Sequence, residues 1–411
     1  MILGSLAITC TLLSCQVITL NVCNGVQKNS EKDNIYLLKS LLQDCGPIVL
    51  FVRGLKSIKA NSFENNNVNG APNGIRMDAK ILYGRNERYM NNHVSLEEIH
   101  SALSVNGDPW VAGETGLSSL PLEEKKQYLG ASPPPDVPSI DEIEQRVFAM
   151  REEIDNEGLR AFRENASRDL RNVDGKNYVT PIKNQKRCGS CVAFATLATA
   201  ESTLQIQQKY SNGIDLSEAH LFFCLANALG KTCETGWWAK EALDRFKDNG
   251  VFGESFLKYE EALARDPHCS GFQLSPEYYF KIMGYVDLTG QPALIKEWID
   301  KKGPVIASFI VYEDLYIYKG GVYKHVAGER SGSHCVAIIG YNDSEGCWIC
   351  KNSWGTDWGE EGFFRIAYGE CGIHLWANYG ITGVTGVRIE DPPDPDPDEC
   401  TDYDCPPHRP M

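Results

Sequence analysis

Cys191 stands where a thiol could act as a nucleophile. It begins a segment, Val192 to Ala200, of good helix formers that is apolar on most sides, which predicts a buried helix. An ordinary thiol, with a pKa of about 8.5, is only a few per cent ionised at neutral pH. The amide dipoles at a helix N-terminus favour an anion, so this position predicts a stabilised thiolate if a cation lies nearby.

The candidate cation and the group that orients it lie on later segments. His334 opens an apolar run that reads as a strand, so the strand can anchor it while the ring reaches another part of the fold. Asn352 can accept a hydrogen bond from the imidazole and fix its tautomer without adding charge. Trp354 is expected to cover that bond and exclude water. Together these residues predict nucleophilic catalysis by Cys191 with His334 as acid and base.

Other chemistry could use some of the same residues. Cys188 and Cys191 form a Cys-x-x-Cys pair, but their flanks lack the preceding strand of a small βαβ redox unit. A structural zinc site needs paired close spacings of Cys and His, which are not repeated here. A lone histidine is by default a hydrogen-bonded core residue. For His334, only the presence of Cys191 and Asn352 argues for a catalytic role.

The order of the predicted elements indicates the fold class. From about Ser167 the pattern is first helical, and from Tyr285 it contains strand-like runs. These runs are Val305–Val311, Cys335–Ile339 and Phe363–Ile366. Helices first and strands later predict an α+β fold of two lobes. We expect Cys191 on a helical lobe, His334 and Asn352 on a β-rich lobe, and a cleft between them.

Three blocks of this sequence resemble the signature blocks of papain-like cysteine peptidases, in the same order. They are Gln185–Phe194, Ser333–Tyr341 and Lys351–Gly362, and the likeness extends from about Ser167 to Gly383. The resemblance implies a two-lobed papain-like fold and a cysteine-type endopeptidase made as a zymogen. It also implies that Gln185 and the backbone N–H of Cys191 hold the oxyanion. A catalytically silent papain-like binding protein and a peptide ligase on the same scaffold are the alternatives.

The resemblance further implies disulfides and a substrate pocket. The disulfides join Cys188 to Cys233 and Cys224 to Cys269, and we also expect a bond between Cys350 and Cys371. The pocket is expected to include Gly236, Trp238, Ser333 and Trp376.

The sequence departs from the family pattern at a few positions. Val192 replaces an aromatic residue, Leu170 a tryptophan and Thr235 a glycine, from which we expect altered packing and less certain substrate binding near Thr235. No His-His loop of the cathepsin B kind is visible, which favours endopeptidase activity over the trimming of dipeptides.

Four regions are expected along the chain. Residues 1–22 lack charged side chains and are mostly apolar, which predicts a signal peptide, with a membrane anchor or a lipoprotein signal as alternatives. Residues 23–165 form a pro-region that covers the cleft, including a helix that begins after Ser139 as N-cap. Residues 166–388 form the peptidase domain, and residues 389–411 an Asp/Pro-rich tail.

Composition limits the partners and the compartment. Fifteen cysteines favour an oxidising environment, hence the secretory pathway with an extracellular or lysosomal (vacuolar) destination. The net charge of −15 argues against nucleic acid and against a polybasic membrane patch. We expect peptide or protein substrates and the chain's own pro-region as partners, no membrane contact beyond the signal segment, and a monomer. No cofactor and no metal are implied.

Overall fold

The computed structural model describes residues 17–19, 49–51, 94–133, 139–153, 166–209, 213–265, 269 and 278–388. The chain divides into two compact units, Met1–Asp78 and Ala79–Met411. In the first unit, strands β1 (Val17–Thr19) and β2 (Val49–Phe51) pair in parallel. Most of the predicted signal peptide and all of the tail lie outside the described residues. Everything below concerns the second unit.

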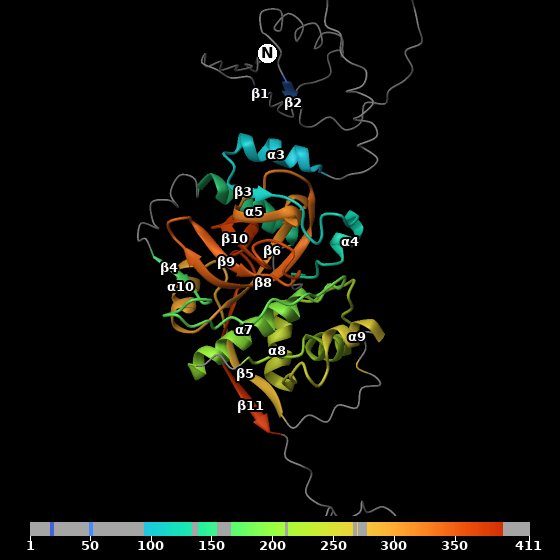
Figure 1. Cartoon of the computed structure of the whole chain (residues 1–411). Helices are drawn as coiled ribbons and strands as arrows, with labels where there is room; N and C mark the ends of the chain where they lie inside the picture. The colour runs from blue at the N-terminus through green and yellow to red at the C-terminus, as the bar shows by residue number, and fades with distance from the viewer. Residues whose placement is uncertain are drawn as a thin grey trace, which may run out of the picture. The chain divides into compact units, whose positions relative to one another are not determined.

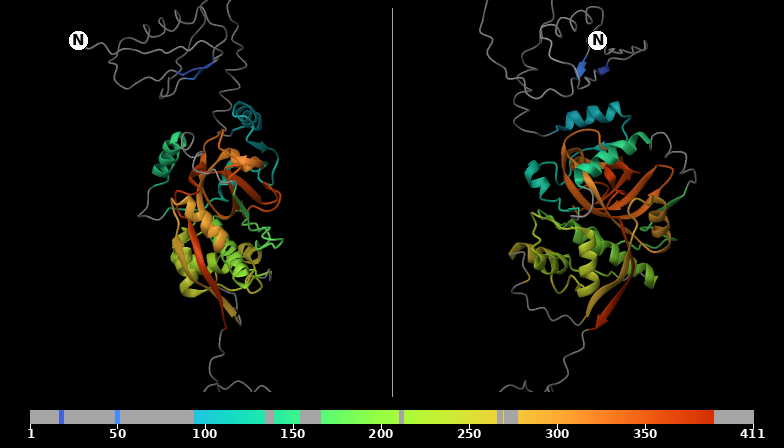
Figure 2. Two further views of the ribbon diagram at one scale, coloured as in Figure 1. Left: turned by 90° about the vertical axis from the view of Figure 1, so that its left-hand side faces the viewer. Right: turned by 180° about the vertical axis from the view of Figure 1, so that it is seen from behind.

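One lobe of this unit is built around helix α7 (Cys191–Gln208). Every α7 residue from Cys191 to Gln205 is buried, which explains why the segment is apolar on most sides. Helix α8 (Ala239–Asn249) instead buries one stripe formed by Ala242, Leu243 and Phe246. The lobe is completed by the π-helix η2 (His220–Ala226), the short η3 (Asn227–Leu229) and α9 (Tyr259–Arg265). These helices gather at one end of the unit (Figures 1 and 2).

The other lobe contains most of a nine-stranded sheet with the order β3-β7-β10-β9-β8-β6-β11-β5, to which β4 adds by pairing with β8. The strands are β3 (Trp110–Ala112), β4 (Ser167–Asp169), β5 (Tyr278–Asp287), β6 (Val305–Tyr312), β7 (Tyr318–Tyr323), β8 (Arg330–Asn342), β9 (Cys347–Lys351), β10 (Phe363–Ala367) and β11 (Tyr379–Arg388). Helix α10 (Pro292–Lys301) and the 3-10 turns η4 (Glu313–Ile317) and η5 (Glu370–Gly372) connect them. All eight residues of β6 are buried, so this strand is a continuous apolar run and does not alternate. The predicted two-lobed α+β fold is confirmed.

Residues N-terminal to β4 add elements to the sheet lobe. Strand β3 pairs antiparallel with the edge strand β7, and Trp110 is buried there between Tyr318 and Tyr323. Helices α3 (Leu96–Val105), α4 (Leu122–Lys126) and α5 (Ile140–Glu153) belong to the same region. The predicted N-cap of α5 is confirmed, because the Ser139 hydroxyl accepts from the Glu142 amide and the Glu142 carboxylate accepts from the Ser139 amide.

The cysteines form two disulfides among the described residues, Cys188–Cys233 and Cys224–Cys269. The expected Cys350–Cys371 bond is wrong, since both cysteines are buried and neither forms a disulfide. The strand register explains this. Ala367, at the end of β10 that leads to Cys371, pairs with Cys347, whereas Cys350 pairs with Phe364 farther inside the sheet.

Candidate active site

Cys191 is the first residue of α7, and contacts with the segment around Cys233 fix the turn before it. The Cys188–Cys233 disulfide and a hydrogen bond of 2.9 Å from the Gly189 amide to the Cys233 carbonyl fix this turn. A Cβ atom at Gly189 would lie 2.5 Å from that carbonyl, so the close approach requires glycine. Val192, which replaces an aromatic residue, is fully buried as a helix residue.

His334 lies on β8, opposite Phe309 of β6, and is fully buried. Its Nε2 lies 2.7 Å from Oδ1 of Asn352. Oδ1 also accepts from the Ser353 amide at 2.8 Å, which identifies this atom as the oxygen and makes Nε2–H the donor. Nδ1 is therefore left as the basic nitrogen. The Trp354 ring lies over the imidazole with centroids 4.7 Å apart, as expected of a cover for this bond.

Gln185 directs its side-chain N–H groups toward two carbonyls. Nε2 donates to the Cys188 carbonyl at 2.7 Å and to the Tyr128 carbonyl at 3.0 Å. Its Oε1 accepts from the Ser353 hydroxyl at 2.7 Å, and its backbone amide donates to the Ser353 carbonyl at 2.9 Å. Ser353 therefore ties Gln185 of one lobe to the Asn352 segment of the other. Sequence reasoning missed this role, although Ser353 directly follows Asn352.

The segment Tyr128–Ser132, from the N-terminal region, is bonded to both lobes at this place. On the sheet lobe, the amides of Gly130 and Ala131 donate to the Ser333 carbonyl, at 3.2 and 3.3 Å, and the Ser333 hydroxyl donates to the Ala131 carbonyl. On the helical lobe, the Trp237 amide donates to the Gly130 carbonyl at 2.8 Å and the Ser132 amide to the Trp237 carbonyl at 2.9 Å.

Glycines permit this close contact. A Cβ atom at Gly130 would lie 2.0 Å from the Gly189 carbonyl oxygen, and one at Gly236 would lie 2.1 Å from the Gly130 carbonyl oxygen. No side chain fits at either position, so two backbones from different parts of the chain meet directly.

Burial keeps both reactive groups neutral. It raises the pKa of the Cys191 thiol to about 12, against a smaller lowering by nearby backbone groups, those of Cys335 and Gly130 foremost. It lowers the pKa of His334 to about 4, against a smaller rise from Asn352 and from the backbone of Tyr128. Nδ1 of His334 nevertheless makes no hydrogen bond of ordinary geometry. Burial therefore opposes the thiolate that the helix N-terminus favours.

The four expected pocket residues lie at different places. Gly236 and Ser333 contact the Tyr128–Ser132 segment. Trp238 is half-buried, with the Lys231 ammonium 3.7 Å above its ring, and its neighbour Trp237 makes the backbone bonds instead. Trp376 is buried beside Gly372, which also lies next to Ile143 and Val147 of α5.

Within the described residues, no group of His, Cys, Asp or Glu side chains has an arrangement that could hold a metal ion. Across that same part of the chain, no helix combines the length and apolar character that crossing a membrane requires.

Comparison with known sequences points to one family. The sequence model of the papain family cysteine proteases matches residues 165–381. The chain is 30% identical over 352 residues to cathepsin B-like cysteine proteinase 2 of Haemonchus contortus, covering 77% of this chain and 94% of that protein. It is 33% identical over 218 residues to a gut-specific cysteine proteinase of Caenorhabditis elegans, covering 47% of this chain and 65% of that one.

Solved structures of precursors resemble this one. Procathepsin B S9 from Trypanosoma congolense superimposes with a TM-score of 0.53 at 22% identity, covering 70% of this chain and 98% of that chain, which shows a shared fold. The recombinant stem bromelain precursor superimposes with a TM-score of 0.52 at 26% identity, covering 75% and 94%. Both similarities extend beyond the 217-residue length of the family match into the N-terminal region.

Proposed function

The chain belongs to the papain family of cysteine proteases, and we propose that it is a latent precursor whose Cys191, His334 and Asn352 hydrolyse peptide bonds once residues 23–165 are removed. The observation that carries this proposal is the Tyr128–Ser132 segment, which places a peptide carbonyl on Gln185 at a site where Cys191 and His334 are both fully buried.

Removal of this segment would readmit water to the site. The charged forms of Cys191 and His334 then regain solvation, the pKa of the thiol falls and that of the imidazole rises. Proton transfer from the thiol to Nδ1 gives a thiolate and an imidazolium, with Nε2–H still held by Asn352. The N-terminus of α7 favours the anion once burial no longer opposes it.

Catalysis follows from these groups. The Cys191 thiolate attacks the substrate carbonyl carbon, and Gln185 Nε2 with the Cys191 amide binds the resulting oxyanion. The His334 imidazolium gives its Nδ1 proton to the leaving amine. A water molecule, deprotonated by Nδ1, then attacks the thioester and releases the acid. The Tyr128 carbonyl, which accepts from Gln185 Nε2 at 3.0 Å, supports this role of the glutamine.

We also propose that the activity is endopeptidic. The chain contains no two adjacent histidines, the feature that would favour the trimming of dipeptides from a carboxyl end. Internally quenched peptides with a blocked C-terminus would be cleaved as fast as the same peptides with a free carboxylate. A strong preference for the free carboxylate would contradict this assignment.

The route and organisation of the protein are part of the same proposal. We propose residues 1–22 as a signal peptide, a secretory or lysosomal destination, and a monomeric peptidase domain of residues 166–388 followed by a tail of residues 389–411. Relatives named as cathepsin B-like and gut-specific proteinases support such a route. Sequencing the N-terminus of the secreted and the acid-processed protein would locate both cleavage sites.

Active-site labelling tests the catalytic assignment. The full chain, matured at acid pH, is treated with an epoxide that alkylates activated thiolates, and the adduct is mapped by mass spectrometry. We expect the adduct on Cys191 and its loss in His334→Ala. An adduct on another cysteine, or none on matured protein, would contradict the assignment.

A further inference from the structure

Ser190 is an N-cap residue that does not cap its helix. A serine at this position normally accepts a hydrogen bond from an amide of the first turn. Here the Ser190 hydroxyl makes no such bond, and it lies instead 2.7 Å from the hydroxyl of Tyr259, the first residue of α9. The Ser190 side chain therefore does not compete with an anion at Cys191 for the N-terminus of α7.

The Tyr259 hydroxyl also donates to the backbone carbonyl of Gln185 at 2.8 Å. A carbonyl can only accept, so the single hydroxyl hydrogen of Tyr259 points to Gln185. The Ser190 hydroxyl must then donate to the Tyr259 oxygen. The chain of hydrogen bonds runs from Ser190 through Tyr259 to Gln185, and all three residues are buried.

These two contacts are the two supports of the proposed oxyanion site. Gln185 carries the side-chain donor, and Ser190 forms the peptide bond whose N–H is the Cys191 donor. Building on the proposed function, we propose that Tyr259 is a positioning residue that sets the separation and direction of the two oxyanion donors. Its ring never touches the substrate carbonyl in this role.

The surroundings of Tyr259 make it a rigid support. Its ring packs edge-on against Phe194 of α7, with centroids 4.8 Å apart, and stacks on Phe223 at 5.3 Å. Burial raises its pKa, so the hydroxyl keeps its hydrogen at every pH at which the enzyme would work. Ser353 holds Gln185 from the other lobe, so the glutamine is fixed from both sides.

The test compares matured wild-type enzyme with Tyr259→Phe, which keeps the ring contacts and removes the hydroxyl. Deleting a direct oxyanion donor costs about 10²–10³ in kcat, so misdirecting the donors is expected to lower kcat roughly ten- to fifty-fold. KM should change less than twofold. A peptide aldehyde, whose thiohemiacetal oxygen occupies the oxyanion site, should bind more weakly by the same factor as kcat. The alkylation rate of Cys191 by iodoacetamide, which needs no oxyanion site, should remain at the wild-type value.

Two variants complete the design. Tyr285→Phe removes a tyrosine hydroxyl that donates to Asp244 at 2.6 Å in another part of the lobe, and it should leave aldehyde affinity and kcat unchanged. Ser190→Ala, which keeps the Tyr259–Gln185 bond, should weaken the aldehyde less than Tyr259→Phe does. Unchanged aldehyde affinity in a folded Tyr259→Phe enzyme would overturn the proposal. A wild-type enzyme that neither cleaves peptides nor reacts with iodoacetamide at Cys191 would instead overturn the proposed function.

Discussion

At the scale of single residues, the chemistry of Cys191 depends on which residues cover its thiol. The helix N-terminus favours a thiolate, as the sequence predicts, whereas burial of the thiol opposes it. In the proposed precursor the segment Tyr128–Ser132 contacts both lobes at the site, and burial shifts the pKa of Cys191 and of His334 in the directions that remove both charges. Under the proposed function, latency follows from protonation state as well as from blocked access.

This argument predicts how Cys191 reacts before and after maturation. With a pKa of about 12, only about one Cys191 in 10⁵ is ionised at pH 7 in the precursor. Iodoacetamide should therefore label Cys191 at least about a hundredfold faster in the matured protein, as measured by mass spectrometry. Cys335, which is 1% exposed, serves as an internal control and should stay unlabelled in both forms. Equal labelling rates of Cys191 would show that the segment does not control the thiol.

The pKa of His334 predicts that acid opens a Cys191→Ala precursor. It is about 4 when covered, against 6.5 for an ordinary histidine. Between these values the open form of this variant, which has no thiol to supply the proton, binds a proton from solution that the closed form does not, so the closed form loses stability as pH falls from 6.5 to 4. The loss is about 3 kcal/mol in total and ends below pH 4.

Hydrogen exchange at the Gly130 and Ala131 amides measures this opening in a Cys191→Ala precursor, which cannot cleave itself. We expect protection, corrected for intrinsic exchange, to weaken as pH falls from 6.5 to 4, and to weaken much less when His334→Ala is added. His220, whose pKa burial also lowers to about 4, stacks on Phe252 in the helical lobe, so adding His220→Phe should leave the pH dependence intact. The same pH dependence with and without His334 would exclude this histidine as the cause.

At the scale of elements, the N-terminal region is attached by a strand and by helices. The indole of Trp110 on β3 donates to the Lys324 carbonyl at 2.8 Å, and its ring lies against Tyr318 and Tyr323 of β7. On α5, Glu144 accepts from the Tyr312 hydroxyl at 2.6 Å and from Arg330 at 3.0 Å. Each attachment joins residues on opposite sides of the proposed maturation boundary.

Replacing Trp110 by alanine should therefore weaken latency without harming the matured enzyme. Truncation of a buried tryptophan costs about 3–5 kcal/mol, and here the lost contacts lie between the N-terminal region and β7. Maturation at a fixed mildly acid pH should be at least about tenfold faster, followed by gel electrophoresis, while kcat/KM of the product is unchanged. Val111→Ala on the same strand, where the side chain is 61% exposed, is the matched control. If both variants mature at the wild-type rate, β3 is not an anchor of the latent state.

The sequence could predict those features that depend on residues close together along the chain, and not those that depend on contacts across the fold. The α5 start was predictable because Ser139 and Glu142 are three residues apart and satisfy each other locally. The order of helices before strands predicted the two lobes. The contact of Gly130 with Gly189 and Gly236 was not predictable, because it depends on backbones that meet across the fold. The Cys350–Cys371 prediction failed for the same reason, since strand register decides which cysteines become neighbours.

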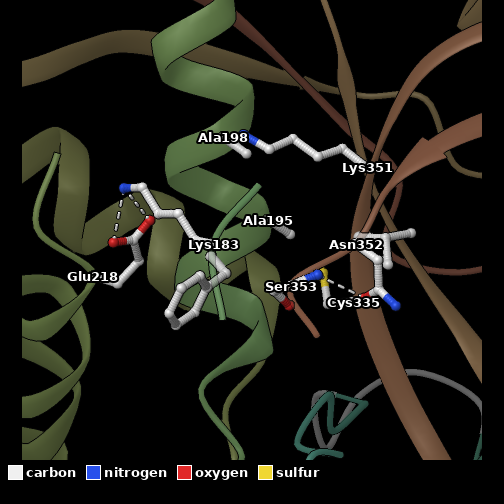
Figure 3. Close-up of a pocket in the computed structure, with 10 residues that line it drawn as sticks. Lys183, Ala195, Ala198, Glu218, Cys335, Lys351, Asn352 and Ser353 are labelled. Carbon is white, nitrogen blue, oxygen red and sulfur yellow. Dashed lines mark hydrogen bonds and ion pairs between the residues drawn. The ribbon is translucent and has the colours of Figure 1, made fainter. Parts of the chain in front are cut away.

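At the scale of the whole molecule, charged side chains gather around a small pocket next to the candidate site. Figure 3 shows the small pocket there, with Lys183 and Glu218 on the α7 side and Lys351 and Asn352 on the strand side. The Lys183 ammonium lies 2.7 Å from Glu218 and 3.3 Å from Glu201.

A hydrogen-bond chain crosses between the lobes at this cluster. Lys351 donates to the Thr180 hydroxyl at 2.8 Å, and Thr180 donates to Glu201 of α7. Since Lys351 directly precedes Asn352, this chain fixes the strand end that carries a candidate catalytic residue.

Removing the central cation should destabilise the whole molecule in a pH-dependent way. Lys183→Met leaves the fully buried Glu201 and Glu218 without their ammonium partner, and breaking a buried pair in this way costs about 3–5 kcal/mol.

The pH dependence follows from Glu218. Burial already raises the pKa of Glu218 to about 8 although Lys183 lowers it, so the variant must raise this pKa further. Near pH 6 Glu218 is protonated in both the wild type and the variant, so the lost ammonium costs little there. Near pH 9 the wild-type Glu218 carboxylate ionises beside Lys183, whereas the variant must bury an uncompensated charge or hold a proton taken up from dilute solution. In a Cys191→Ala background, thermal unfolding should therefore show a Tm deficit of about 10 °C at pH 9 that shrinks toward pH 6. Lys186→Met, which removes an exposed pair with Glu260 at 3.6 Å, should change Tm by no more than about 2 °C at either pH. A Lys183→Met deficit that is the same at pH 6 and pH 9 would mean that lost packing of the lysine stem, and not an uncompensated carboxylate, accounts for the cost, and the cluster would then contribute little through its charge.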